Sequence, residues 1–145
     1  DKGMTIPLLP PKTEPLVDND KFMTLQWLIF QDELANGDAG TTWTPTFIGL
    51  TEVGTAIKTG VYYRLSKKLV VYRIVVTPGT NTSATAGTTY CDNFPLIMNA
   101  AGPVFSLSDY TATITGSTPS NRRIYTGTWA ALTTPVTILG IVEAS

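Results

Sequence analysis

The feature that most constrains the fold is an alternation of apolar and polar residues that begins at Thr41 and continues to Val142. Its strongest stretch is LVVYRIVVT, residues 69–77, in which successive side chains would point to opposite faces of a sheet. Residues 57–65 alternate in the same way. We therefore expect two antiparallel strands that form a hairpin with its tip at 66–68.

Further short strands follow the same rule. Trp43, Pro45 and Phe47 alternate with threonines and predict an edge strand, because proline cannot donate a ladder hydrogen bond. Five more strands are expected at 88–91, 104–107, 110–115, 122–126 and 136–142. Residues 78–87 and 127–134 are predicted to be loops because Gly, Thr and other turn residues dominate them.

Strands recurring at intervals of about 8–12 residues, with no helix between them, predict a mainly β fold. We expect an antiparallel, jelly-roll-like β-sandwich over residues 41–145. Within it, Gly140 predicts a bulge or a close backbone contact. Arg73 interrupts the strongest strand and indicates an edge strand or an oligomer contact, with a structural salt bridge as the alternative.

The segment before the β region, residues 20–37, has the spacing of an apolar helix. Two apolar seams run along it and leave only a narrow polar face. A single small domain can cover one seam, so the other favours a second copy of the chain. We expect an oligomerisation helix whose interface residues are Phe22, Met23, Trp27, Phe30 and Leu34. The alternative is a core helix inside one domain.

Residues 1–19 precede that helix and contain prolines at 7, 10, 11 and 15. Proline at this density excludes a helix and favours an extended path. The apolar residues between the prolines predict an extended arm that lies across a neighbouring subunit or a partner protein.

Composition excludes several classes of function. The 145 residues carry a net charge of −1, with only 14% charged residues, so we expect no nucleic-acid-binding surface. Histidine is absent and Cys91 is the single cysteine, which excludes histidine-dependent catalysis, an intrachain disulfide and the usual zinc sites. No run of about 18 apolar residues predicts a membrane span. The 25 threonines suit half-exposed β surfaces.

Carboxylates are the remaining catalytic option. A glycosidase needs two of them at a defined separation, and nothing in the sequence brings Glu52, Asp92 and Asp109 together. We expect no enzyme activity, no cofactor and no metal site.

Aromatic and arginine side chains are favoured anchors for partners, and aromatic rings also stack on sugars. Tyr90 and Tyr125 belong to this group, with core positions as the alternative for Tyr125 and Trp129. The residues expected to contact a receptor or partner are Tyr110, Arg122, Arg123 and Trp129.

The run PLVDNDKFMTLQWLIF, Pro15 to Phe30, resembles segments of tailed-bacteriophage virion proteins. The stretch from Gly37 to Thr51, with its Trp-Thr-Pro strand, and the hairpin and Gly/Thr-rich loop between Thr59 and Tyr90 resemble the C-terminal β domains of phage tail fibres and related appendages. Ser66 and Lys67 stand where those hairpins usually have a glycine, so the hairpin tip is expected to differ.

The resemblance implies a homotrimeric virion protein of tail-fibre or tail-tip type. Residues 1–19 would dock on other virion proteins, and the β domain would face a host receptor, either a protein or a glycan. The alternative is a capsid decoration protein that clamps neighbouring capsid subunits. The expected location is the virion, with no insertion into a membrane.

Overall fold

The computed structural model describes residues 39–145. The proline-rich arm expected over 1–19 and the helix expected over 20–37, with its interface residues Phe22, Met23, Trp27, Phe30 and Leu34, lie outside the described residues.

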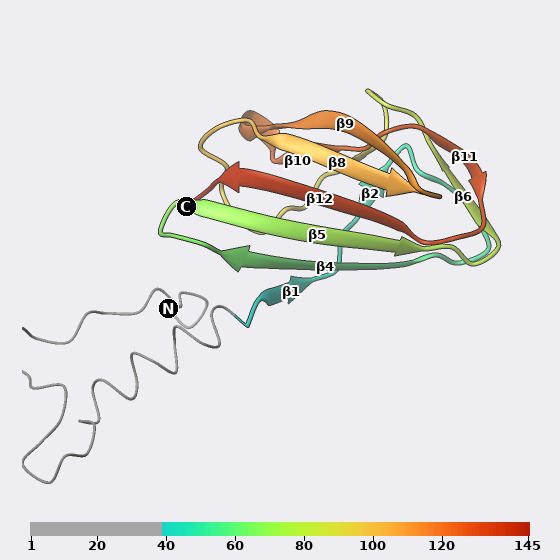
Figure 1. Ribbon diagram of the computed structural model, residues 1–145, viewed down its shortest axis with the longest axis horizontal. Helices are drawn as coiled ribbons and strands as arrows, with labels where there is room; N and C mark the ends of the chain where they lie inside the picture. The colour runs from blue at the N-terminus through green and yellow to red at the C-terminus, as the bar shows by residue number, and fades with distance from the viewer. Residues whose placement is uncertain (1–38) are drawn as a thin grey trace, which may run out of the picture.

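The described chain is mainly β, and all of its strand pairings are antiparallel, as predicted. Nine strands form one sheet in the order β1-β4-β5-β12-β8-β9-β10-β7-β2, and three form a second in the order β11-β6-β3 (Figure 1). The strands are β1 (Thr41–Trp43), β2 (Phe47–Ile48), β3 (Thr51–Val53), β4 (Ile57–Arg64), β5 (Leu69–Thr77), β6 (Asn81–Ala84), β7 (Tyr90–Cys91), β8 (Pro103–Ser108), β9 (Thr111–Thr118), β10 (Arg123–Tyr125), β11 (Trp129–Leu132) and β12 (Val136–Glu143). A short 3-10 turn, η1 (Pro119–Asn121), separates β9 from β10.

The large sheet is curled so that its two edges come close together. β1 and β2 occupy opposite edges of the sheet, yet only residues 44–46 separate them in the sequence. The Asn93 side chain holds this corner: its amide donates to the Thr44 carbonyl at 2.8 Å, and its oxygen accepts from the Thr46 N–H at 2.9 Å. The predicted edge strand is therefore two edge strands, with Pro45 in the corner between them.

The hairpin of β4 and β5 follows the prediction. The two strands pair from Ile57 with Thr77 to Arg64 with Val70, and the Leu65 N–H closes the tip on the Leu69 carbonyl. The two faces of β5 also separate as expected, because its inward residues are fully buried. Those residues are Val70, Tyr72, Ile74 and Val76.

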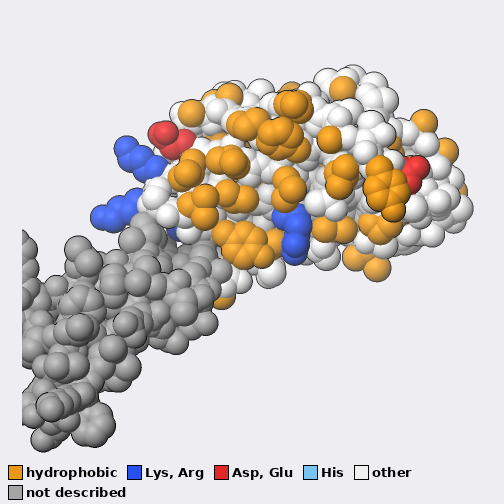
Figure 2. Space-filling model, in the orientation of Figure 1, with side chains coloured by type: hydrophobic (Ala, Val, Ile, Leu, Met, Phe, Trp, Pro, Cys, Tyr) orange, Lys and Arg blue, Asp and Glu red, His pale blue; other side chains and the backbone are white. Residues whose placement is uncertain are grey.

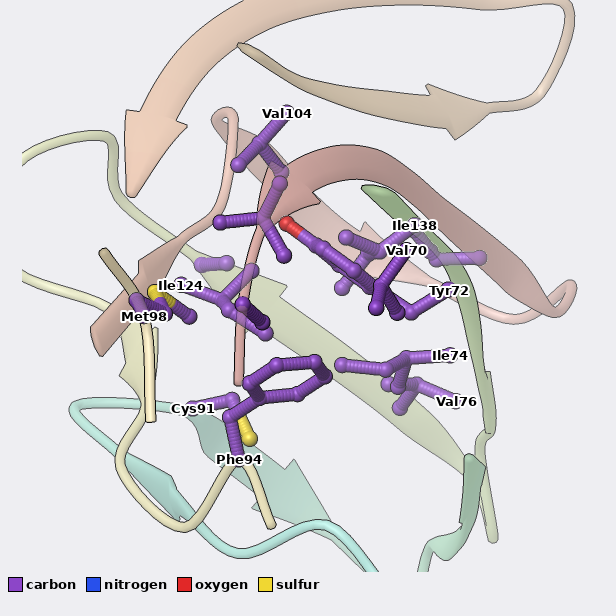
Figure 3. Packing of buried hydrophobic residues seen from close by; sticks show 14 of the residues in the cluster. Val70, Tyr72, Ile74, Val76, Cys91, Phe94, Met98, Val104, Ile124 and Ile138 are labelled. Carbon is purple, nitrogen blue, oxygen red and sulfur yellow. The ribbon is translucent and has the colours of Figure 1, made fainter. Parts of the chain in front are cut away.

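One hydrophobic core lies inside the curl. Inward residues of β5 and β12 meet Cys91, Phe94 and Ile124 from the opposite side of the sheet (Figure 3). The rings of Tyr72 and Phe94 have their centroids 5.2 Å apart. Gly140 makes the close contact predicted for it, with Tyr72, and β12 keeps a regular register with no bulge there.

The three-stranded sheet was not predicted. The segments 78–87 and 127–134 were expected to be loops, but they contain β6 and β11, which pair with each other. β6 has the sequence NTSA and carries no large apolar side chain, so its pattern resembles a polar loop. The loop prediction is therefore wrong at these two strands.

Arg73 does not lie on an edge strand. It is on β5, which pairs with β4 on one side and β12 on the other, so the edge-strand prediction is wrong. Its side chain points away from the core and is exposed. Within residues 39–145 the salt bridge is between Lys58 and Glu52, so the salt-bridge alternative finds no support there.

Candidate interaction surfaces

The outward side of β4, β5, β12 and β8 carries an unusual number of apolar side chains. We call this set the outer apolar face. Hydrophobic side chains gather over these strands in Figure 2. The face comprises Val61, Tyr63, Leu69, Val71, Val75, Phe105, Leu107, Leu139 and Ile141.

The strand register aligns this face into rows. Arg73 lies opposite Leu139, which lies opposite Phe105 on the next strand, and Phe105 lies opposite Ile114 on β9. Phe105, Leu139 and Ile141 are each 40–42% exposed, and Ile114 is 71% exposed. Such side chains in adjacent rows leave apolar carbon in contact with water over several strands.

The sequence explains why this face is apolar. β5 and β12 carry apolar residues on both their inward and outward positions, whereas a strand with one solvated face normally alternates with polar residues. Contiguous apolar surface of this kind marks an interaction site in a soluble protein. The runs at 69–77 and 136–142 already contained this signal, but within them only Arg73 was predicted as a candidate oligomer contact.

Trp129 is not a surface contact. It is 6% exposed, belongs to the hydrophobic core, and donates its Nε1–H to the Thr82 hydroxyl at 3.0 Å. The structure therefore agrees with the alternative given from the sequence, in which Trp129 is a core residue.

Tyr110 and the two arginines lie at opposite ends of β9. Tyr110 is 98% exposed in the turn between β8 and β9, where Asp109 and Tyr110 both have positive φ, as a two-residue type I′ turn requires. Arg122 and Arg123 follow β9 at its far end, about 25 Å away for a strand of this length. The structure does not bring Tyr110 together with the arginines.

Arg123 instead joins two tyrosines on neighbouring strands. Tyr90 and Tyr125 are paired across β7 and β10, with ring centroids 5.2 Å apart. The Arg123 guanidinium carbon lies 4.2 Å from the centre of the Tyr90 ring, a cation–π contact. Arg122 points elsewhere: it is exposed and has a left-handed backbone after η1. We call Tyr90, Arg123 and Tyr125 the tyrosine stack.

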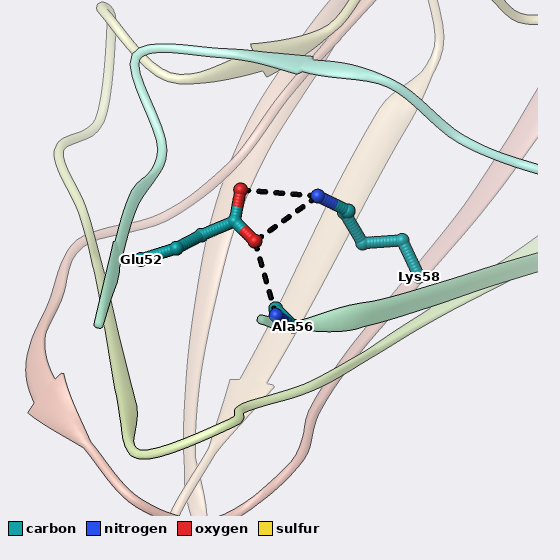
Figure 4. A network of polar contacts seen from close by, with 3 residues as sticks. All are labelled: Glu52, Ala56 and Lys58. Carbon is teal, nitrogen blue, oxygen red and sulfur yellow. Dashed lines mark hydrogen bonds and ion pairs between the residues drawn. The ribbon is translucent and has the colours of Figure 1, made fainter. Parts of the chain in front are cut away.

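Glu52 and Asp92 have hydrogen-bond partners, and Asp109 lies in a turn. Glu52 binds the Lys58 ammonium through both oxygens at 3.0–3.1 Å and accepts the Ala56 N–H at 3.2 Å, which fixes the turn before β4 (Figure 4). Asp92 accepts the Thr46 hydroxyl at the corner between β1 and β2. Asp109 forms the turn between β8 and β9. Residues 39–145 contain no group of three metal-ligating side chains.

Cys91 is fully buried, and burial raises the pKa of its thiol to about 11. Because the thiolate is the reactive form, this thiol is poorly suited to nucleophilic chemistry at neutral pH. Its Sγ–H donates to the Asn93 side-chain oxygen, beside the corner of the sheet.

No family model, no curated protein and no solved structure matches this chain. Within the described part of the chain, no helix is long and apolar enough to cross a membrane.

Proposed function

We propose that this chain is a structural protein of a tailed-bacteriophage virion, of tail-fibre or tail-tip type, and that it assembles as a homotrimer. The observation that carries the proposal is the outer apolar face, which one copy of the described domain leaves uncovered. Assembly through this face would remove it from water. Burial of apolar surface contributes a favourable free energy of about 25 cal/mol for each Å².

The occupant that we propose for the outer apolar face is a second copy of the chain. The described chain begins beside this face, because Gly40 packs against the side chains of Val61 and Tyr63. Residues 20–37, which we propose as the oligomerisation helix, join the domain at this same place. Copies held together by that helix would have their outer apolar faces close to one another.

The face also has the charge character of a contact between identical copies. Arg73 is the one charged residue in its central rows. A nearly neutral surface creates little repulsion when it meets a copy of itself, whereas like charges directly opposed would destabilise the contact.

The remaining parts of the chain complete the proposal. Residues 1–19 dock on other virion proteins, and the apolar seam with Met23, Trp27 and Phe30 holds the trimer. The curled sheet serves as a jelly-roll-like head that projects for host attachment. Two layers of strands facing one core support this description of the head.

Quantitative mass spectrometry of purified phage particles, combined with antibody labelling in electron micrographs, tests this function. We expect a copy number that matches the tail fibres and label at the tail. Label over the whole capsid, with a copy number that matches the capsid subunits, would replace the proposal by the capsid decoration alternative.

A further inference from the structure

The tyrosine stack borders an open depression, because Tyr125 is one of the residues that line it. The depression has a volume of about 460 Å³ and lies where β9 meets β10. This size falls within the range of about 300–1,000 Å³ that is usual for small-molecule sites. Its lining consists of Gly87, Thr115, Gly116, Thr118 and Tyr125.

Gly116 and Tyr125 line the depression from two neighbouring strands, β9 and β10. The pairing of β9 with β10 joins Arg123 with Thr118 and Ile124 with Ser117, and Gly116 and Tyr125 are the next residues on the two strands. Tyr125 in turn pairs with Tyr90, and Gly116 pairs with Pro103. Gly116 therefore adds no side chain to the lining beside Tyr125's strand.

Packing does not require glycine at this position. A Cβ on Gly116 would meet only the Gly102 carbonyl oxygen, at 3.7 Å, and Gly116 is not among the glycines with positive φ. Gly127 and Gly140 differ, because a Cβ on either would lie 2.0 Å or less from a side-chain oxygen. The open space at Gly116 thus leaves the aromatic ring accessible without serving the core.

The ring of Tyr125 is held in place before any ligand arrives. The ring packs against Tyr90, the Arg123 guanidinium donates to its hydroxyl at 3.5 Å, and the Thr115 hydroxyl donates to the Tyr125 carbonyl. A fixed aromatic surface loses little conformational entropy when a ligand stacks on it.

The two threonines in the lining are oriented as acceptors. The Thr115 hydroxyl proton goes to the Tyr125 carbonyl, and the Thr118 hydroxyl proton goes to the Asn121 side-chain oxygen. Each oxygen keeps lone pairs that can accept a hydrogen bond from a ligand. The lining contains no charged residue. A ligand that donates through hydroxyl groups fits these oxygens, and the Arg123 guanidinium that borders the depression already contacts the Tyr90 ring and the Tyr125 hydroxyl.

We propose that this depression binds a neutral saccharide, with a sugar ring stacked on Tyr125 and sugar hydroxyls donating to Thr115 and Thr118. The C–H face of a sugar ring matches the aromatic surface, and the hydroxyl groups match the two acceptors. This inference rests on the proposed function, because it names the ligand class through which the projecting head attaches to a host. Three identical sites on one trimer would strengthen a weak single contact through multivalency.

The test uses the full chain on an array of neutral oligosaccharides built from hexoses and N-acetylhexosamines, alongside sialylated and sulfated ones. Titration calorimetry then measures the affinity for the best neutral binder. We expect neutral binding that falls about tenfold or more in Gly116→Val, because the new side chain fills the depression. The matched control, Ala112→Val, adds the same kind of side chain at an outward position four residues earlier on β9 and should leave the affinity unchanged.

Three results would overturn the inference: no binding to any neutral oligosaccharide at millimolar concentration, binding only to the acidic ones, or unchanged affinity in Gly116→Val. Tyr125→Leu provides a second test, because it removes the stacking ring while keeping an apolar side chain. Light scattering on each variant separates this inference from the proposed function. A trimer that binds no neutral sugar contradicts only the inference, whereas a monomer contradicts the proposed function.

Discussion

Gly140 on β12 lies directly opposite Tyr72 on β5, and the absence of a side chain on Gly140 makes room for the Tyr72 phenol. A Cβ on Gly140 would lie 2.0 Å from the Tyr72 hydroxyl oxygen and 2.1 Å from the ring carbon that bears it. Tyr72 is fully buried at the centre of the core (Figure 3). The bare backbone at Gly140 therefore provides the space that the buried Tyr72 ring occupies beside β12.

Gly140→Ala should destabilise the protein by about 3 kcal/mol, because the added methyl group forces the buried ring or the strand to move. The measurement is the free energy of unfolding in urea at a fixed protein concentration. The double variant with Tyr72→Leu should lose less than the two single variants together, since the smaller side chain relieves the overlap. Strict additivity would show that the Tyr72 ring is not the obstacle.

The corner between β1 and β2 depends on the Asn93 side chain, which bonds the backbone of Thr44 and Thr46. Asn93→Ala should cost about 1 kcal/mol, the usual net value of exposed hydrogen bonds of this kind. Hydrogen exchange should accelerate at residues 41–48 before it does so in β5 or β12. Unchanged exchange at these residues would mean that pairing with β4 and β7 alone holds the corner.

Alkaline pH should destabilise the protein through Cys91. Burial raises the pKa of its thiol from 9.0 to about 11, so the folded state holds the proton more tightly than the unfolded state. The stability that the protonated thiol contributes is fully present below pH 9 and is lost as pH rises through 11. The resulting change in the free energy of unfolding is about 3 kcal/mol. Urea unfolding from pH 8 to 11 should show a smaller loss of stability in Cys91→Ala than in the wild type. If stability falls equally with pH in Cys91→Ala and in the wild type, the loss does not come from Cys91.

Trp27→Asp and Phe30→Asp should disperse the oligomer while leaving the β circular dichroism intact, because each places a charge in the apolar seam proposed for the oligomerisation helix. Lys21→Asp is the control, since it alters charge at the polar entrance of the same segment. Loss of the β signal together with the oligomer would instead support the alternative of a core helix.

Local pattern predicted the strands whose alternation is strong. β4, β5 and β12 were found because apolar residues recur at every second position. β6 and β11 were missed because a polar residue, Thr82, takes the buried place on β6 and is satisfied only by Trp129, 47 residues away. Such a partner cannot be identified from neighbouring residues.

The candidate surfaces also depend on residues that are far apart in the sequence, which a local pattern does not reveal. Arg73 was expected at an edge or an oligomer contact, with a salt bridge as the alternative. The pairing of β5 with β12 joins segments far apart in the sequence and excludes the edge. Tyr90, Tyr125 and Arg123 were all candidates from the sequence. Arg123 and Tyr125 are neighbours on β10, and the pairing of β7 with β10 brings Tyr90 to them. The depression beside Tyr125 was not predicted, because it depends on Gly116 and Tyr125 coming together where β9 meets β10.

The mass of the purified full chain in solution, measured by light scattering after size exclusion, tests the assembly through the outer apolar face most directly. We expect a trimer for the wild type and for Ser120→Asp, whose exposed site lies in η1. Leu139→Asp should lower the mass toward that of the monomer, because it places a charge in the central row beside Phe105. A wild-type mass of 15.6 kDa, that of a single chain, would contradict the account.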